Sequence, residues 1–113
     1  MSITSDMLRG HTDTIILANL RRKDSYGYEI NKTISNISQN RYELKEATLY
    51  SAFRRLEEAG HISSYWGDEK TGARRRYYSI TRSGRELYEN NVKDWEETKV
   101  TIDRLLKNEE DAI

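Results

Sequence analysis

The stretch ATLYSAFRRLEEAGHI, residues 47–62, combines arginine, tyrosine and serine side chains in a pattern that favours contact with DNA. If the stretch is helical, Ser51 and Arg54 lie opposite its large apolar residues, with Tyr50 beside them. Small residues early on this side allow close approach to base edges. Ser51 and Arg54 can donate hydrogen bonds to bases or phosphates, and Tyr50 can donate its hydroxyl to a phosphate. An ordinary solvated face, with Arg54 and Glu58 as an ion pair, is the competing interpretation.

A second basic cluster follows shortly afterwards. Arg74, Arg75 and Arg76 are consecutive, and the polar loop before them contains Lys70. On a strand, Arg75 points to the face opposite its two neighbours. Phosphate contact is the simplest interpretation of a cluster this basic so close to an arginine-bearing helix.

The charge distribution agrees with one anionic partner, although the net charge is zero. Residues 1–40 carry five Lys/Arg and four Asp/Glu, a net of +1. Residues 41–85 carry ten and six, a net of +4, and residues 86–113 carry four and nine, a net of −5. A basic middle and an acidic end predict one surface for a nucleic acid and another for solvent.

The composition indicates one folded domain without disulfides. The 113 residues suffice for a single domain, and no cysteine is present. The longest apolar run, IILA at 15–18, is too short for a signal peptide or a membrane span. We therefore expect a cytoplasmic protein.

Three helices are expected before residue 60. The first covers 5–22, and its apolar stripe is made of Leu8, His11, Ile15 and Ala18. The second follows Asp24 or Ser25 as N-cap, and its stripe is made of Tyr26, Ile30, Ile34 and Ile37. The third covers roughly 45–59, with inner residues Leu49, Ala52, Phe53, Leu56 and Ala59. Gly60 is expected to end it in the left-handed conformation.

The hydrophobic period then changes to two. HISSYW (61–66) and RRRYYSI (74–80) are typical of an antiparallel hairpin, with Ile62 and Ile80 as inward anchors. Thr81 is expected to cap a final helix over 82–108. The predicted fold is mainly α with a β-hairpin wing, which is a winged helix-turn-helix followed by a long C-terminal helix.

The stretch LYSAFRRLEEAGHI, the hairpin ending RRRYYSITRSG and the final tryptophan-bearing helix resemble the PadR-like family of bacterial transcriptional regulators. Length and the SSYWGDE and GARRRYYSIT motifs resemble its short, multidrug-responsive members. The resemblance implies a homodimeric repressor on a palindromic operator, with a DNA-binding domain over 1–80 and a dimerisation helix over 81–113. The implied DNA contacts are Thr48, Tyr50, Ser51, Arg54, Lys70, Arg74 and Arg75.

The last helix carries an apolar seam that no remaining part of the chain is expected to cover. We expect a second copy of the chain to cover it, with the N-terminal helix completing the interface. The seam is made of Tyr88, Val92, Trp95, Ile102 and Leu106, widened by Leu105 and interrupted by Lys99. Trp95 is either core or, as the resemblance implies, part of a cavity for a planar aromatic ligand. Met7, Thr14 and Asn91 would then be nearby, and Lys99 would disfavour cationic ligands.

No constellation of residues indicates an enzyme, a metal site or a cofactor. GDEKTG at 67–72 has the spacing of a phosphate-binding loop, but Ala73 and Arg74 follow it where the lysine and the hydroxyl residue are needed. His11 and His61 have no ligand-spaced partners. A winged-helix module that binds protein, without DNA or ligand, remains the alternative to a repressor.

Overall fold

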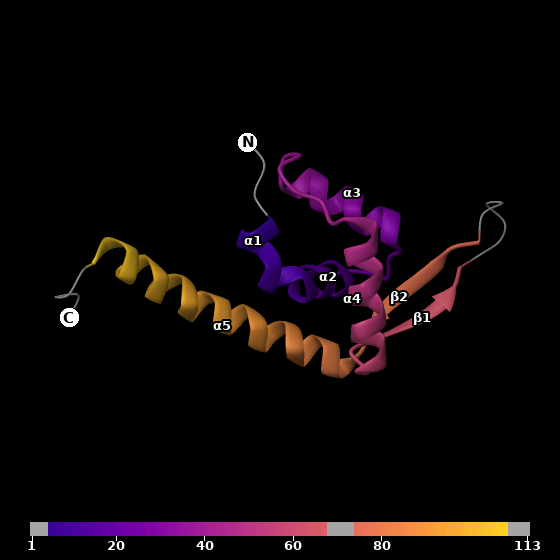
Figure 1. The fold of residues 1–113 in the computed structure, drawn as a ribbon. Coiled ribbons are helices and arrows are strands. Elements are labelled where there is room, and N and C mark those ends of the chain that lie inside the picture. The colour runs from indigo at the N-terminus through magenta and orange to yellow at the C-terminus, as the bar shows by residue number, and fades with distance from the viewer. Residues whose placement is uncertain (1–4, 68–73, 109–113) are drawn as a thin grey trace.

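The computed structural model describes residues 5–67 and 74–108 and confirms the predicted fold class. The hairpin and the last helix project in opposite directions from a cluster of helices (Figure 1). The elements in chain order are α1 (Ser5–Leu8), the 3-10 turn η1 (Arg9–His11), α2 (Thr12–Leu20), α3 (Gly27–Ile37), α4 (Glu46–Glu58), β1 (Ile62–Trp66), β2 (Arg76–Ile80) and α5 (Arg82–Lys107).

The core lies where α2, α3, α4 and the base of the hairpin meet. Phe53 of α4 stacks on Tyr78 of β2 with ring centroids 3.9 Å apart. The other fully buried side chains of the core are Ile16, Leu17, Leu20, Ile30, Leu49, Leu56 and Ile62. Burial of this apolar surface fixes α4 against the rest of the fold and leaves its opposite side in solvent.

The prediction of one continuous helix over 5–22 was wrong. The chain forms a 3-10 turn at Arg9–His11, where Gly10 disfavours a helix, and α2 ends at Leu20. The predicted stripe from Leu8 to Ala18 is only half-buried, whereas Ile16 and Leu17 are in the core. Both sides of α2 are covered, one by the core and one by α5, so a single stripe could not describe it.

Two predictions for α3 also need correction. Ile37 is 72% exposed, because α3 ends there and its last turn leaves the core. Neither Asp24 nor Ser25 caps the helix, whose N-cap is Tyr26. The backbone of Ser25 instead pairs with that of Tyr78, with N–O distances of 2.8 and 3.2 Å, so the segment before α3 is tied to the hairpin.

The C-terminal end of α4, the hairpin and the N-terminal end of α5 follow the sequence predictions. Gly60 adopts a φ of 79°, the left-handed conformation expected just past α4. β1 and β2 are antiparallel with Ile62 opposite Ile80, and both pack toward the core as predicted. Thr81 caps α5, its hydroxyl accepting a hydrogen bond from the Gly84 amide at 3.2 Å. Within the described ranges, no helix has the length and apolar character needed to span a membrane.

Candidate nucleic-acid interface

The outer side of α4 presents the side chains expected to contact DNA. Thr48, Tyr50, Ser51 and Arg54 are all exposed. Within residues 5–67 and 74–108, Arg54 makes no ion pair or side-chain hydrogen bond, so the Arg54–Glu58 pair of the competing interpretation does not form. The Arg54 guanidinium can therefore turn to an incoming anion without first breaking a contact.

Tyr50 is held by its packing. Its ring lies edge-on to Phe53 with centroids 5.6 Å apart. Its hydroxyl lies against the start of α3, so close that a Cβ on Gly27 would be 2.7 Å from it. Any larger residue at position 27 would displace Tyr50, which links the first turn of α3 to the proposed contact surface.

Hydrogen bonds outside the core fix both ends of α4. At its start, the Asn31 side chain donates to the Leu44 carbonyl at 2.7 Å and accepts from the Leu44 amide at 2.8 Å. Near its end, Glu57 accepts from Ser64 and lies 3.8 Å from Arg76. The helix is thereby attached to α3 at one end and to the hairpin at the other.

The arginines of the hairpin rest on aromatic rings. Arg74 and Arg76 lie over Trp66, with the guanidinium carbon 4.8 and 5.5 Å from the ring centroid. Arg75 lies over Tyr26 at 4.8 Å, on the other side of the hairpin, which confirms the predicted alternation. Such cation–π contacts orient a guanidinium while keeping its charge available. Lys70 lies outside the described residues.

A row of tyrosines supports Arg75. Tyr77 stacks on Tyr65 with centroids 5.7 Å apart and meets Tyr26 edge-on at 5.3 Å. The Tyr65 hydroxyl donates to Asp24 at 2.6 Å, and this bond to a carboxylate raises the pKa of Tyr65. The row joins the hairpin to the segment before α3.

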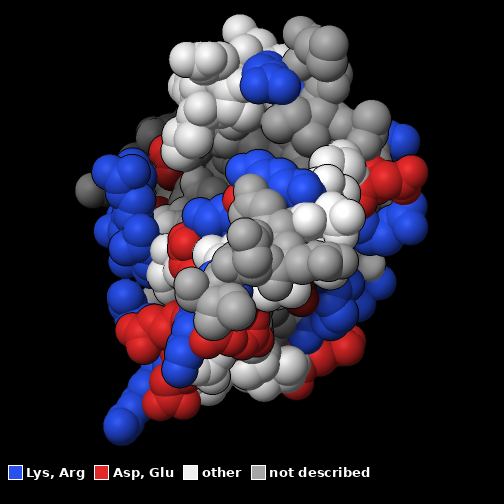
Figure 2. Space-filling model, turned by 90° about the vertical axis from the view of Figure 1, so that its left-hand side faces the viewer, with Lys and Arg blue, Asp and Glu red and all other residues white. Residues whose placement is uncertain are grey.

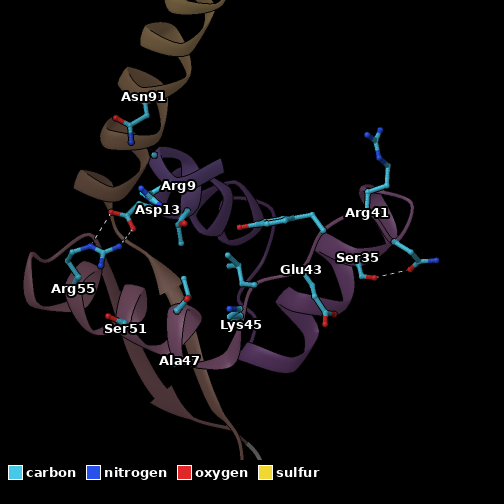
Figure 3. A pocket seen from close by; sticks show the side chains of 16 residues that line it. Arg9, Asp13, Ser35, Arg41, Glu43, Lys45, Ala47, Ser51, Arg55 and Asn91 are labelled. Carbon is cyan, nitrogen blue, oxygen red and sulfur yellow. Dashed lines mark hydrogen bonds and ion pairs between the residues drawn. The ribbon is translucent and has the colours of Figure 1, made fainter. Parts of the chain in front are cut away.

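A cleft of about 1300 Å³ opens beside α4, between α2 and the turn that precedes α4 (Figure 3). Thr48 and Ser51 line it, as do four cations and two acids: Arg9, Arg41, Lys45, Arg55, Asp13 and Glu43. Arg55 is bound to Asp13. On the face seen in Figure 2, cationic and anionic side chains are interspersed.

The residues expected around a ligand are partly brought together. Trp95 is 40% exposed and meets the His11 ring edge-on at 4.8 Å. Asn91 donates to the Thr14 hydroxyl at 2.9 Å, whereas Met7 is exposed. Lys99 pairs with Glu96 at 2.9 Å. In the part of the chain that the structure describes, no group of His, Asp or Glu side chains could hold a metal ion.

Comparison with known proteins agrees with this geometry. A family model described as "Transcriptional regulator PadR-like family" matches residues 16–90, which include the second half of α2, then α3, α4, the hairpin and the start of α5. The chain belongs to the PadR-like family. PadR-like regulators are DNA-binding repressors and not enzymes, so the prediction that the chain is not an enzyme is confirmed.

This PadR-like chain matches several relatives over almost their whole length. A solved transcriptional regulator from Clostridium thermocellum is 50% identical, with a TM-score of 0.82 over 88% of this chain and 97% of that one. A PadR family regulator from Clostridium difficile is 35% identical, with a TM-score of 0.75 over 85% and 98%. An uncharacterised protein from Lysinibacillus sphaericus is 46% identical over 105 residues, 93% of this chain and 96% of its own length.

Two features of this PadR-like interface were missed from sequence. The rings under the arginines could have been found, because pairing Ile62 with Ile80 places Trp66 opposite Arg76. The Asp13–Arg55 contact carried no such signal, because 42 residues separate its partners. Only the packing of α2 against α4 brings the two side chains together.

Proposed function

We propose that this PadR-like regulator is a homodimeric repressor that binds a palindromic operator with α4 as its recognition helix. The observation that carries the proposal is the free outer side of a well-anchored α4. Ser51 and Arg54 are exposed with no side-chain partner in the described ranges, while core packing and hydrogen bonds fix the helix itself. A rigid helix with free donors is suited to the major groove, and Thr48 and Tyr50 extend the same surface.

The wing supplies phosphate contacts in this proposal. Arg74 and Arg75 lie on opposite sides of the hairpin, each over an aromatic ring, and Lys70 belongs to the loop between the strands. Phosphate neutralisation would add affinity that depends on salt and not on sequence. Residues 1–80 would form the DNA-binding domain, and we expect the regulator to act in the cytoplasm.

Dimerisation is assigned to residues 81–113, with the N-terminal helix completing the interface. The far half of α5 exposes Ile102, Leu105 and Leu106, which lie within about 100° of one another around the helix. Apolar residues spaced along one side of a long helix favour a second helix as their cover. A two-fold axis through paired α5 helices would place the two recognition helices about 34 Å apart, one turn of DNA.

The test of DNA binding starts from a pool of random duplexes, from which the wild-type protein selects its operator. Fluorescence anisotropy then gives affinity as a function of salt. We expect Arg54→Ala to weaken operator binding about tenfold and Arg75→Ala to reduce the salt slope by about 0.9, the loss of one phosphate contact. Arg104→Ala, an exposed arginine of α5, is the matched control and should change neither.

Normal affinity and slope for both variants would show that the interface is elsewhere. Failure of the wild-type protein to bind any duplex in a salt-dependent way would favour the alternative, a winged-helix module that binds protein.

We further propose that Trp95 contributes to a site for a planar aromatic ligand, as in multidrug-responsive members of the family. Support comes from the 40% exposure of Trp95 in the middle of the seam and from its contact with the aromatic ring of His11. Met7, Thr14 and Asn91 would lie at its margin. Lys99 disfavours cationic compounds, although its pairing with Glu96 reduces that effect.

The ligand proposal is tested by tryptophan fluorescence of Trp66→Phe protein, in which Trp95 is the only tryptophan. Planar aromatic drugs should quench it saturably, and operator DNA should weaken the quenching if the two sites are coupled. A Trp95→Phe protein in which Trp66 is retained is the control. No saturable quenching by any compound would mean that Trp95 is a packing residue.

A further inference from the structure

Four consecutive residues at the start of α2, His11 to Thr14, contact both α5 and α4. On one side, His11 meets Trp95 and Thr14 accepts a hydrogen bond from Asn91, both on α5. On the other side, Asp13 accepts from Arg55 on α4. The helical turn explains this division, because positions 11 and 14 share one side of α2 and position 13 lies about 100° from Thr14.

We infer that this 11–14 segment sets the position of α4 relative to α5, and that Arg55 is a positioning residue and not a DNA contact. The inference rests on the proposed function, in which α4 is the recognition helix and α5 the dimerisation helix. In such a dimer, a rotation of α4 relative to α5 would change the distance between the two recognition helices. The Asp13–Arg55 contact would then determine which half-site spacing the repressor accepts.

The geometry of the contact suits this role. Arg55 donates through two nitrogens to the two carboxylate oxygens of Asp13, with Nε 3.4 Å from one oxygen and Nη2 closer to the other. Such a two-point contact restrains direction as well as distance. The Asp13 carboxylate also raises the pKa of Arg55. Figure 3 shows the pair at one edge of the cleft, below Asn91 of α5.

Arg54 and Arg55 are neighbours in sequence but differ in their side-chain contacts. Arg54 is exposed, has no partner in the described ranges and lies on the outer side of α4. Arg55 is 56% exposed but is committed to a carboxylate that is itself only 32% exposed. The other side-chain contacts that hold α4 run to α3 and to the hairpin. The Arg55–Asp13 contact instead runs to the helix that carries the contacts with α5.

Removal of the carboxylate separates positioning from direct contact by the sign of its effect. If Arg55 bound a phosphate, Asp13→Ala would free it and remove a negative charge, so operator binding would tighten or stay unchanged. If Arg55 acts through Asp13, the variant should weaken operator binding about fivefold. Arg55→Ala should weaken it equally, and the double variant no further, because both remove one interaction.

Two further readouts complete the DNA test. The salt slope should stay at the wild-type value in Arg55→Ala, and operators with one base pair added or removed between half-sites should be discriminated less well. Arg54→Ala is the matched control and should keep the spacing preference while losing affinity. A lower salt slope in Arg55→Ala, or tighter binding by Asp13→Ala, would overturn the inference.

A measurement without DNA keeps the inference testable if the proposed function fails. The chain has no cysteine, so Ala47→Cys on α4 and Lys93→Cys on α5 allow two spin labels at exposed positions. Labelled protein diluted into excess unlabelled protein reports the distance within one chain. Asp13→Ala and Arg55→Ala should broaden or shift this distance, and Arg54→Ala should not. An unchanged distance in Arg55→Ala would overturn the inference, whatever the protein binds.

Discussion

The two halves of α5 carry similar apolar spacing but differ in what covers it. In the first half, Leu87 and Tyr88 pack against the core, and Arg21 lies over the Tyr88 ring at 4.8 Å. In the second half, Leu105 is 72% exposed and Leu106 is 80% exposed. Figure 1 shows this second half extending well beyond the other helices.

This difference separates the contribution of one chain from that of a partner. The first half of α5 is stabilised by the fold itself, through its cap and its contact with α2. The second half exposes apolar surface that gains free energy only when another molecule covers it. Damage to the first half should therefore destabilise the monomer, and damage to the second should affect assembly.

The largest expected effect comes from the second half. Leu105→Glu combined with Leu106→Glu should dissociate the proposed dimer at micromolar concentration. Each leucine buried between two copies would contribute about 2 kcal/mol, and the two copies together lose four of them. The mass in solution, from light scattering after gel filtration, should fall to that of one chain. The DNA-binding half should remain folded by circular dichroism.

The control for this prediction is an exposed position on another side of α5. Arg104→Glu adds a carboxylate to the same half of α5, about 160° around the helix from Leu106 and about 100° from Leu105, and should leave the mass unchanged. If the double variant keeps the wild-type mass, the exposed second half of α5 is not the surface through which the chain assembles.

The second largest effect is expected at the junction between α5 and the hairpin. Gly84 is buried, and a Cβ there would overlap the His61 carbonyl oxygen and lie 2.8 Å from Ile80 Cγ1. Because backbone would have to move, Gly84→Ala should lower the free energy of unfolding by about 3 kcal/mol. Urea denaturation measures the loss, and Glu89→Ala, an exposed position on the same helix, should show almost none. Equal midpoints for the two variants would contradict this account of the junction.

The sequence predicted what depends on local pattern. The inner face of α4 from Leu49 to Leu56, the hairpin anchored by Ile62 and Ile80, and the left-handed Gly60 all follow from periodicity or from the conformational freedom of glycine. The prediction was wrong for Ala59, which lies past the end of α4 and is exposed. Family resemblance then pointed to α4 and the wing as the DNA interface. The individual contacts remain predictions, because a free arginine on a helix shows availability and not a partner.

The sequence failed where two distant segments share a residue. Ser25 looked like a helix cap, but its backbone is used by Tyr78, 53 positions later. The predicted stripe of the first helix failed because α2 is packed on two sides. Periodicity placed Arg54 on the outer side of α4, but nothing in the sequence assigned a partner to Arg55, which α2 supplies by bringing Asp13 to it. These are consequences of tertiary packing, which overrides local pattern.

The smallest effect concerns the cap of α5, which the sequence did predict. The Thr81 hydroxyl accepts from the Gly84 amide at 3.2 Å and donates to the Gly60 carbonyl at 2.7 Å, so it joins the start of α5 to the end of α4. Thr81→Ala should cost about 1 kcal/mol of unfolding free energy, and Thr81→Ser, which keeps the hydroxyl, should recover most of it. Since the cap lies in the half of α5 that belongs to the monomer, the dimer dissociation constant should not change in either variant. If the free energy of dimer dissociation changes as much as the free energy of unfolding, the two halves of α5 act as one unit. The partner would then stabilise the whole helix.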